Sequence, residues 1–206
     1  MDNNKIPFEP DCMYHIYNHG NADDNLFQSN ENYRYFLKKY REYIEPVANT
    51  YSYCLMPNHF HFLIRFKEIE TLKEALNPKH KEDIHFPKLL SRRFSNFFNA
   101  YAKAYNRMYD RRGKLFLSGV KRKKTEDEIY YLQLVQYIHN NPVEHGFVDS
   151  IENWPYSSYR AFLTNQETFI KRNTVLDWFG SETEFLKFHN EDERPKDRKT
   201  CQVFKT

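Results

Sequence analysis

A short apolar run contains two histidines separated by a single residue. It reads Met-Pro-Asn-His-Phe-His-Phe-Leu-Ile over positions 56–64. Because side chains of a strand alternate between its two faces, His59 and His61 are predicted to share one face, and Phe60 and Phe62 the other. Two imidazoles on one face can bind a single divalent metal ion. A turn-capping histidine beside a second one on a sheet surface would explain the pair equally well.

A second segment, from about position 125 to 142, has the pattern of an amphipathic helix. Thr125 can act as its N-cap, three acidic residues follow at positions 126–128, and Pro142 is predicted to end it. Its apolar residues recur at helical spacing and are Ile129, Leu132, Leu134, Val135 and Ile138.

This helix carries a tyrosine and an asparagine on one face. Tyr137 and Asn141 are spaced i and i+4, which places them about 6 Å apart along the axis. A tyrosine can form a covalent intermediate, and an amide oxygen can complete a metal site begun by two histidines. Core packing of Tyr137 and a helix-stop role for Asn141 are the alternative. Tyr101 is the best rival nucleophile, although its spacing with other aromatic residues is typical of a packing stripe.

A third motif, Asn-Trp-Pro-Tyr-Ser-Ser-Tyr, occupies positions 153–159. With the two segments above, the chain resembles the single-tyrosine transposases of the HUH endonuclease superfamily. Within them it is most similar to the REP-associated tyrosine transposases and their insertion-sequence relatives. The likeness runs from about position 14 to 162, with the motifs in family order.

The resemblance implies a specific chemistry. His59, His61 and Asn141 would hold Mg²⁺ or Mn²⁺, and Tyr137 would attack the scissile phosphate of single-stranded DNA, at sites flanked by hairpins. The product would be a 5′-phosphotyrosine linkage and a free 3′-hydroxyl. Positioning and charge neutralisation are the main needs of phosphoryl transfer, so these groups suit the reaction.

Several histidines near these motifs need a separate assessment. Where the relatives have Asn-Arg-Gly after the first strand, this chain has Asn18-His19-Gly20, which removes a possible phosphate contact. By residue type, His19 is a spare metal ligand. His139 and His145 flank the nucleophile and are candidate proton donors, although helical phase turns His139 away from the Tyr137 face.

Basic residues are concentrated between positions 91 and 125. This window has eleven Lys and Arg against one acid, a net +10 that leaves −7 for the remainder of a chain whose total is +3. Such segregation is typical of a phosphate-binding surface, whereas a solvated basic face is the plainer explanation. The residues predicted to contact DNA are Arg92, Arg93, Arg107, Arg111, Arg112, Lys114, Lys121, Arg122, Lys123 and Lys124.

The periodicity of the chain predicts an α+β fold. Strands are expected at 13–18, 50–55, 59–66 and around Leu115-Phe116, and helices at 30–47 and 88–109. This order is ferredoxin-like, an antiparallel sheet with helices packed on one face, and the transposase resemblance implies the same fold. Residues 1–165 are predicted to form the transposase domain, and residues 166–206 a partly disordered extension with short helices.

Composition indicates the size of the core and the compartment in which the protein works. At 206 residues and 40% hydrophobic content, the chain can bury one core. Three scattered cysteines favour a reducing compartment. We expect a cytoplasmic protein with no membrane partner, which acts on single-stranded or hairpin DNA as a monomer or a homodimer.

Three other functions remain open at this point. The chain could be a domesticated protein that binds DNA hairpins without cutting them. It could be a replication initiator or relaxase, although relaxases tend to have a third histidine and a longer chain. A metal-dependent phosphodiesterase is a further alternative, but it would need no tyrosine.

Overall fold

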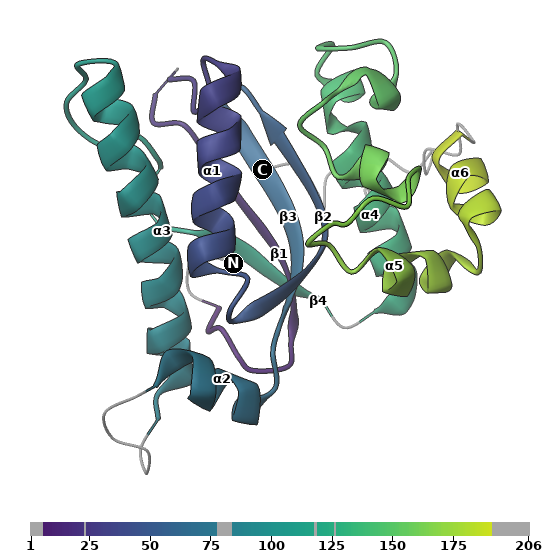
Figure 1. The fold of residues 1–206 in the computed structure, drawn as a ribbon, viewed down its shortest axis with the longest axis horizontal. Coiled ribbons are helices and arrows are strands. Elements are labelled where there is room, and N and C mark those ends of the chain that lie inside the picture. Colours follow the sequence, from purple (N-terminus) through teal and green to yellow (C-terminus); the bar gives the residue numbers. More distant parts are fainter. Residues whose placement is uncertain (1–5, 23, 78–83, 118, 126, 191–206) are drawn as a thin grey trace.

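The structure is a computed structural model that describes residues 6–22, 24–77, 84–117, 119–125 and 127–190. Strands and helices are interspersed up to the fourth strand, and the elements after it are all helical (Figure 1). They are β1 (Met13–His19), α1 (Asn30–Tyr43), β2 (Ala48–Met56), β3 (His59–Phe66), α2 (Ile69–Leu76), α3 (Phe86–Met108), β4 (Lys121–Thr125), α4 (Glu128–Glu144), the 3₁₀ turns η1 (Ile151–Asn153) and η2 (Tyr159–Phe162), α5 (Arg172–Phe179) and α6 (Glu182–Asn190).

The four strands form one antiparallel sheet in the order β2-β3-β1-β4. Strands β1 and β3 are therefore central, and each pairs with a neighbour on both sides. With α1 after β1 and α3 before β4, this is the ferredoxin-like arrangement, which confirms the predicted fold class.

Helices α1 and α3 cover one face of the sheet (Figure 1). The aromatic side chains of this face interlock: the ring centroids of Tyr40 and Phe62 are 4.3 Å apart, and those of Phe36 and Phe97 are 4.8 Å apart. Phe60 and Phe62 of β3 belong to this core, as the alternation of the strand predicts.

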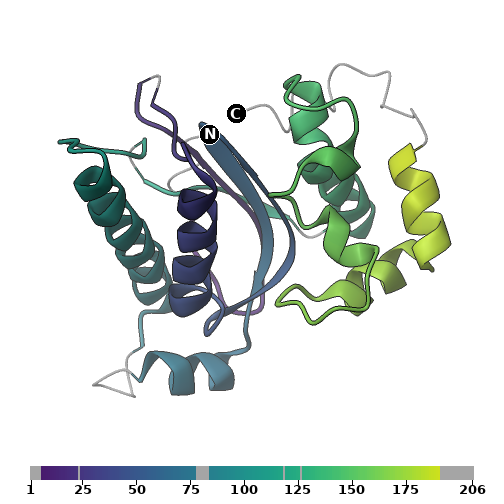
Figure 2. The same ribbon diagram turned by 45° about the horizontal axis from the view of Figure 1, so that its top comes forward.

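The opposite face is covered by α4 and the segments after it, as the second view shows (Figure 2). Leu134, Val135 and Ile138 of α4 pack with Met13 and Leu63 of the central strands. The expectation that helices cover one face is correct for α1 and α3 but incomplete for the chain, because the apolar side of α4 needs a sheet surface of its own to bury against.

Helices α5 and α6 continue the layer formed by α4. Val175 and Phe185 lie in the same apolar cluster as Ile138. The predicted disordered tail after position 190 lies outside the described residues. No helix in the described ranges is long and apolar enough to cross a membrane.

The last strand lies later in the chain than predicted. Leu115 and Phe116 are buried, but Phe116 makes only an isolated bridge to Gly20, and the fourth strand is β4. Consecutive basic residues hide the two-residue period that marks a strand. They suit β4 because it is an edge strand, where charge opposes pairing with other chains.

Both predicted ends of the helix that carries Tyr137 are also wrong. Thr125 lies in β4, and Asp127 is the N-cap of α4, with its side chain accepting a hydrogen bond from the Ile129 amide at 2.9 Å. Pro142 lies inside α4, which continues to Glu144. A proline in the last turn removes only one backbone hydrogen bond, so the helix tolerates it.

A chain of buried hydrogen bonds joins α6, α4 and β2. His189 Nδ1 lies 2.8 Å from the Phe185 carbonyl and must donate to it, so His189 Nε2 accepts from His139 Nδ1 at 2.9 Å. His139 Nε2 then accepts from the Ser158 hydroxyl at 2.8 Å, and Ser158 Oγ accepts from the Tyr53 amide. Burial lowers the pKa values of His139 and His189, and with both imidazoles neutral the chain has one donor direction.

Acid should weaken the fold through this chain. Burial lowers the pKa of His189 to about 4, so the native state leaves it neutral where the unfolded chain, with an ordinary value near 6.5, takes up a proton. Stability should therefore fall as pH drops below about 6.5, with His189 contributing about 1.4 kcal/mol between pH 7.5 and 5.5.

The measurement is the urea unfolding free energy at the two pH values. His189→Gln keeps an acceptor for His139 but cannot titrate, so its loss between pH 7.5 and 5.5 should be smaller than that of the wild type by about that amount. Equal losses in both proteins would contradict the assignment.

Candidate active site

The polar face of the sheet lies beneath α4 and is set by strand register. Tyr17 stands opposite His61, and His19 opposite His59, across the β1–β3 pair. His15 lies on the same face and is wholly buried. The structure thus brings the two predicted histidines together on a central strand, in a row with residues of β1 that sequence reasoning had not joined to them.

A neighbouring side chain holds the Nδ1 atom of each predicted ligand. His61 Nδ1 lies 2.8 Å from His15 Nε2, and His59 Nδ1 lies 2.7 Å from the Asn58 side-chain oxygen. Such contacts fix ring orientation and leave Nε2 as the nitrogen for a ligand.

The imidazoles are held in their neutral form. Burial, followed by repulsion from His19 and His145, lowers the pKa of His59 to about 3. Burial also lowers the pKa of His61 well below its usual range, and it lowers that of His15 to about 3 with help from Lys123. A neutral imidazole has a free lone pair, which is the form that coordinates metals.

Asn141 presents an unused oxygen at this place. Its side chain is fully buried, and its Nδ2 donates to the Tyr137 carbonyl at 2.7 Å. Its Oδ1 is a buried acceptor that has no hydrogen-bond partner among the described residues. A buried unsatisfied acceptor costs about 1–3 kcal/mol, and a cation bound at this place would satisfy it.

These donors suit a divalent cation. Asn141 lies near enough to His59 to raise its pKa against the effect of burial. Within the described ranges, no three His, Cys, Asp or Glu side chains are arranged to hold a metal ion. A cation here would need the amide oxygen as well as the two imidazoles, a set compatible with Mg²⁺ or Mn²⁺.

Tyr137 lies directly against the histidines. Its ring makes edge-to-face contacts with His61 and His15, at centroid distances of 5.5 and 6.2 Å. Both partners belong to the same chain as Tyr137. The rival Tyr101 is buried on α3, on the other side of the sheet, and donates to the Leu26 carbonyl. The structure therefore does not bring Tyr101 to the histidine pair.

The other histidines divide between this site and the core. The ring of His19 stacks on His59 at 4.7 Å, and His145 lies 4.9 Å from His59 and is exposed. Both nitrogens of His139 are taken by His189 and Ser158, so its suggested role as a proton donor is not supported.

Alternation along β4 splits the predicted DNA-binding residues in two. Lys121 and Lys123 lie on the site face, 5.8 and 6.0 Å from the ring of Tyr17. Arg122 and Lys124 point the other way. The Arg122 guanidinium lies 4.0 Å from the centre of the Phe8 ring, and Lys124 pairs with Glu9 at 2.8 Å. Only the first two flank the histidines.

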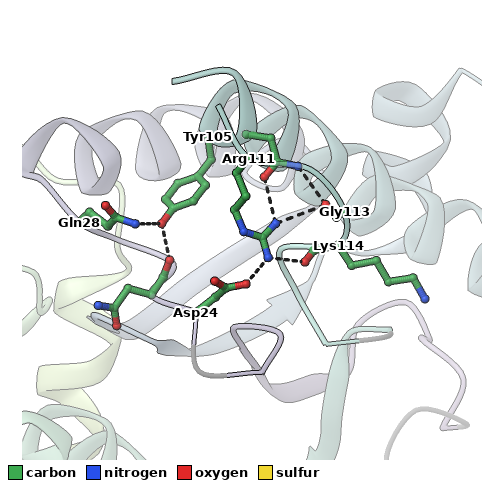
Figure 3. A network of polar contacts seen from close by, with 8 residues as sticks. Asp24, Gln28, Tyr105, Arg111, Gly113 and Lys114 are labelled. Carbon is green, nitrogen blue, oxygen red and sulfur yellow. Dashed lines mark hydrogen bonds and ion pairs between the residues drawn. The ribbon is translucent and has the colours of Figure 1, made fainter. Parts of the chain in front are cut away.

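Arg111 is a structural residue of the loop after α3 (Figure 3). Its guanidinium pairs with the Asp24 carboxylate and donates to the Lys114 carbonyl at 2.8 Å, the Asn106 side chain at 3.2 Å and the Gly113 carbonyl at 3.4 Å. These partners occupy the donors that a phosphate would need, so the prediction that Arg111 contacts DNA is not supported.

The remaining predicted contacts lie on α3, on the far side of the sheet, and on the loop that follows it. Arg93 donates to the Ala75 carbonyl at 2.9 Å. Arg92 and Arg107 are exposed on α3, and Arg112 and Lys114 on the loop that follows it. The sequence window is continuous, but the sheet separates the arginines of α3 from Lys121 and Lys123.

His15 is the site residue that the sequence motifs missed. It alternates with Tyr17 and His19 in β1, which predicts a shared face but does not identify the neighbours of that face. Only the pairing of β1 with β3 reveals that this face meets His61.

The fold and the histidine–tyrosine arrangement are those expected of the transposase class that the sequence resembles. No family model matches the chain. A curated protein of Haemophilus influenzae, with the provisional name REP-associated tyrosine transposase, is 24% identical over 130 residues. The match covers 60% of this chain and 66% of that protein, just under two thirds of its length.

A solved structure supports the same comparison. It shows a REP-associated tyrosine transposase bound to a REP hairpin, and it matches this fold with a TM-score of 0.56 and 16% identity. The match covers 78% of this chain and 84% of that chain. The resemblance to REP-associated tyrosine transposases is thus confirmed in sequence similarity and in fold.

Replacing Lys121 and Lys123 by glutamine should weaken binding to single-stranded DNA. If each contacts one phosphate, the slope of log affinity against log salt should fall by about 1.4 for the pair. Fluorescence anisotropy over a salt series measures this slope.

Arg111→Met is the matched control. It should destabilise the fold by about 1–2 kcal/mol, because the Asp24 carboxylate and the loop carbonyls lose their donor. The slope of log affinity against log salt should stay unchanged. A slope lowered as much by Arg111→Met as by the lysine pair would contradict this division.

Proposed function

We propose that this protein is a transposase-type endonuclease that cleaves single-stranded DNA through a covalent bond to Tyr137. The observation that carries the proposal is the contact between the Tyr137 ring and His61, at a centroid distance of 5.5 Å. The Tyr137 phenol lies beside two imidazoles that burial keeps neutral, on the helix that also carries the buried Asn141 oxygen.

The reaction is a transfer of a phosphoryl group to the phenol oxygen. The Tyr137 phenol gives up its proton to solvent, its oxygen forms the new bond to phosphorus, and the bond to the 3′ oxygen breaks. The leaving oxygen takes up a proton and becomes a 3′-hydroxyl, while the 5′ phosphate stays on the tyrosine. No water is consumed, so the linkage can be reversed to join strands.

The site residues divide the work of this reaction. His59, His61 and Asn141 would hold a divalent cation, Mg²⁺ or Mn²⁺, which would neutralise charge on the scissile phosphate. Asn141 also donates to the Tyr137 carbonyl, which links the proposed ligand to the helical turn that carries the proposed nucleophile. Lys121 and Lys123 would bind phosphates beside the histidines.

We propose hairpin-flanked single-stranded DNA as the substrate. The solved structural relative is bound to a REP hairpin, and β4 places two lysines on the edge of the site face. Because Tyr137 and the histidines come from one chain, a monomer contains every group that the cleavage needs. A relaxase that uses three histidines as ligands is less well supported, since no such group exists in the described part of the chain.

The test is a covalent-trapping assay in the presence of Mn²⁺. The substrates are single-stranded DNAs from the flanks of the gene, with and without a folded hairpin. Label at the 3′ end should migrate with the protein on a denaturing gel, because the 5′ phosphate of that fragment is on the tyrosine. Label at the 5′ end should appear on a shorter free fragment.

Tyr137→Phe and His61→Ala should abolish the adduct, by at least 100-fold. Tyr131→Phe, which removes a phenol from the same helix, should retain it. An adduct that survives in Tyr137→Phe would exclude this nucleophile. Hairpin binding without any adduct would favour the alternative of a DNA-binding protein that does not cut.

A further inference from the structure

We propose that His15 is a positioning residue that accepts the Nδ1 proton of His61 when the Nε2 atom of His61 binds a cation. The inference rests on the proposed function and adds to it a residue outside the histidine pair. Nothing in the sequence motifs assigns a role to His15.

The contact between the two rings is short and excluded from water. His15 Nε2 lies 2.8 Å from His61 Nδ1, and the two side chains are 0% and 1% exposed. The rings are nearly parallel, with centroids 5.0 Å apart and planes inclined by 22°. His15 also touches the edge of Tyr137, so it contacts the ligand and the nucleophile together.

One proton lies between these nitrogens, and its position decides what His61 can do. If His61 Nδ1 carries the proton, His15 Nε2 accepts it, and the Nε2 of His61 has a free lone pair. If His15 Nε2 carries the proton, the Nε2 of His61 must be protonated and cannot bind a cation.

The second nitrogen of His15 makes this choice costly. His15 Nδ1 is buried and has no hydrogen-bond partner among the described residues. In the tautomer that permits ligation, this atom carries a buried and unsatisfied proton. This unsatisfied proton costs free energy, which the binding of a cation to His61 must offset. The acceptor at position 15 in turn satisfies the Nδ1 proton of His61, which would otherwise be buried without a partner.

The Nε2 atom of His15 cannot bind the same cation as the Nε2 atom of His61 in this geometry. It faces the rear nitrogen of the His61 ring and not the side on which the Nε2 of that ring lies. Its place is that of the outer carboxylates and carbonyls that orient metal-bound histidines in other proteins.

Two substitutions separate the acceptor from the bulk of the ring. His15→Gln keeps an oxygen that can accept from His61 Nδ1, whereas His15→Leu fills similar space without an acceptor. Mn²⁺ binding to each variant is followed by calorimetry in the absence of DNA, so that no cleavage accompanies binding.

We expect His15→Leu to weaken Mn²⁺ binding about 10- to 100-fold and His15→Gln to stay within about 3-fold of the parent. Nitrogen NMR of the parent with Mg²⁺ should show His61 protonated at Nδ1. This spectrum needs no variant at position 15, so it tests the tautomer even if His15→Leu fails to fold.

Two results would overturn the role of His15 alone. One is parental Mn²⁺ affinity in folded His15→Leu, and the other is a Mg²⁺-loaded His61 with its proton on Nε2. A parent protein that binds no Mn²⁺ would instead overturn the proposed metal site, and the role of His15 with it.

Discussion

The register between β1 and β3 is the constraint on which the remainder of the structure depends. Each of these strands is buried on both faces, and their alternation sends aromatic residues such as Phe62 to one side and His61 to the other. The aromatic side supplies most of the apolar area that stabilises the sheet, because it is sealed by α1 and α3. A slip of one residue would exchange the two faces, so the same apolar burial that folds the sheet also assembles the candidate site.

The site face is built differently from the apolar face. Beneath α4, buried polar atoms are only partly paired: Asn141 Oδ1 and His15 Nδ1 have no hydrogen-bond partner among the described residues. A core selected for stability alone would avoid both, since each costs free energy. Their concentration around Tyr137, together with neutral imidazoles, is the kind of local conflict that proteins retain where chemistry is done. The hydrogen bonds from His189 through His139 to Ser158 are the contrasting case, because there each imidazole nitrogen has a partner.

Much of this could be predicted from the sequence, and the failures have physical causes. The His59 and His61 alternation and the i, i+4 spacing of Tyr137 and Asn141 are local patterns, and the structure places all four side chains together. The strand β4 was missed because its consecutive cations show no alternation. The structure divides the basic window of residues 91–125 into separate groups, which a count of charges could not foresee. A charge count does not distinguish Arg111, which is enclosed by loop carbonyls, from Lys121 on the site face. His15 needed a pairing between strands that are far apart in sequence.

The turn between β2 and β3 carries one more consequence. Its two carbonyls, of Pro57 and Asn58, accept hydrogen bonds from the amides of Phe27 and Gly20, and the Asn58 side chain holds His59. A methyl group on Gly20 would lie 2.0 Å from the Asp24 carbonyl oxygen, so a larger residue at position 20 would require the backbone to shift. The segment between β1 and α1 thus helps to fix the position of His59, which lies in the β2–β3 hairpin. Insertions would be absorbed poorly here, and natural variation in loop length should be confined to connections that do not touch this turn.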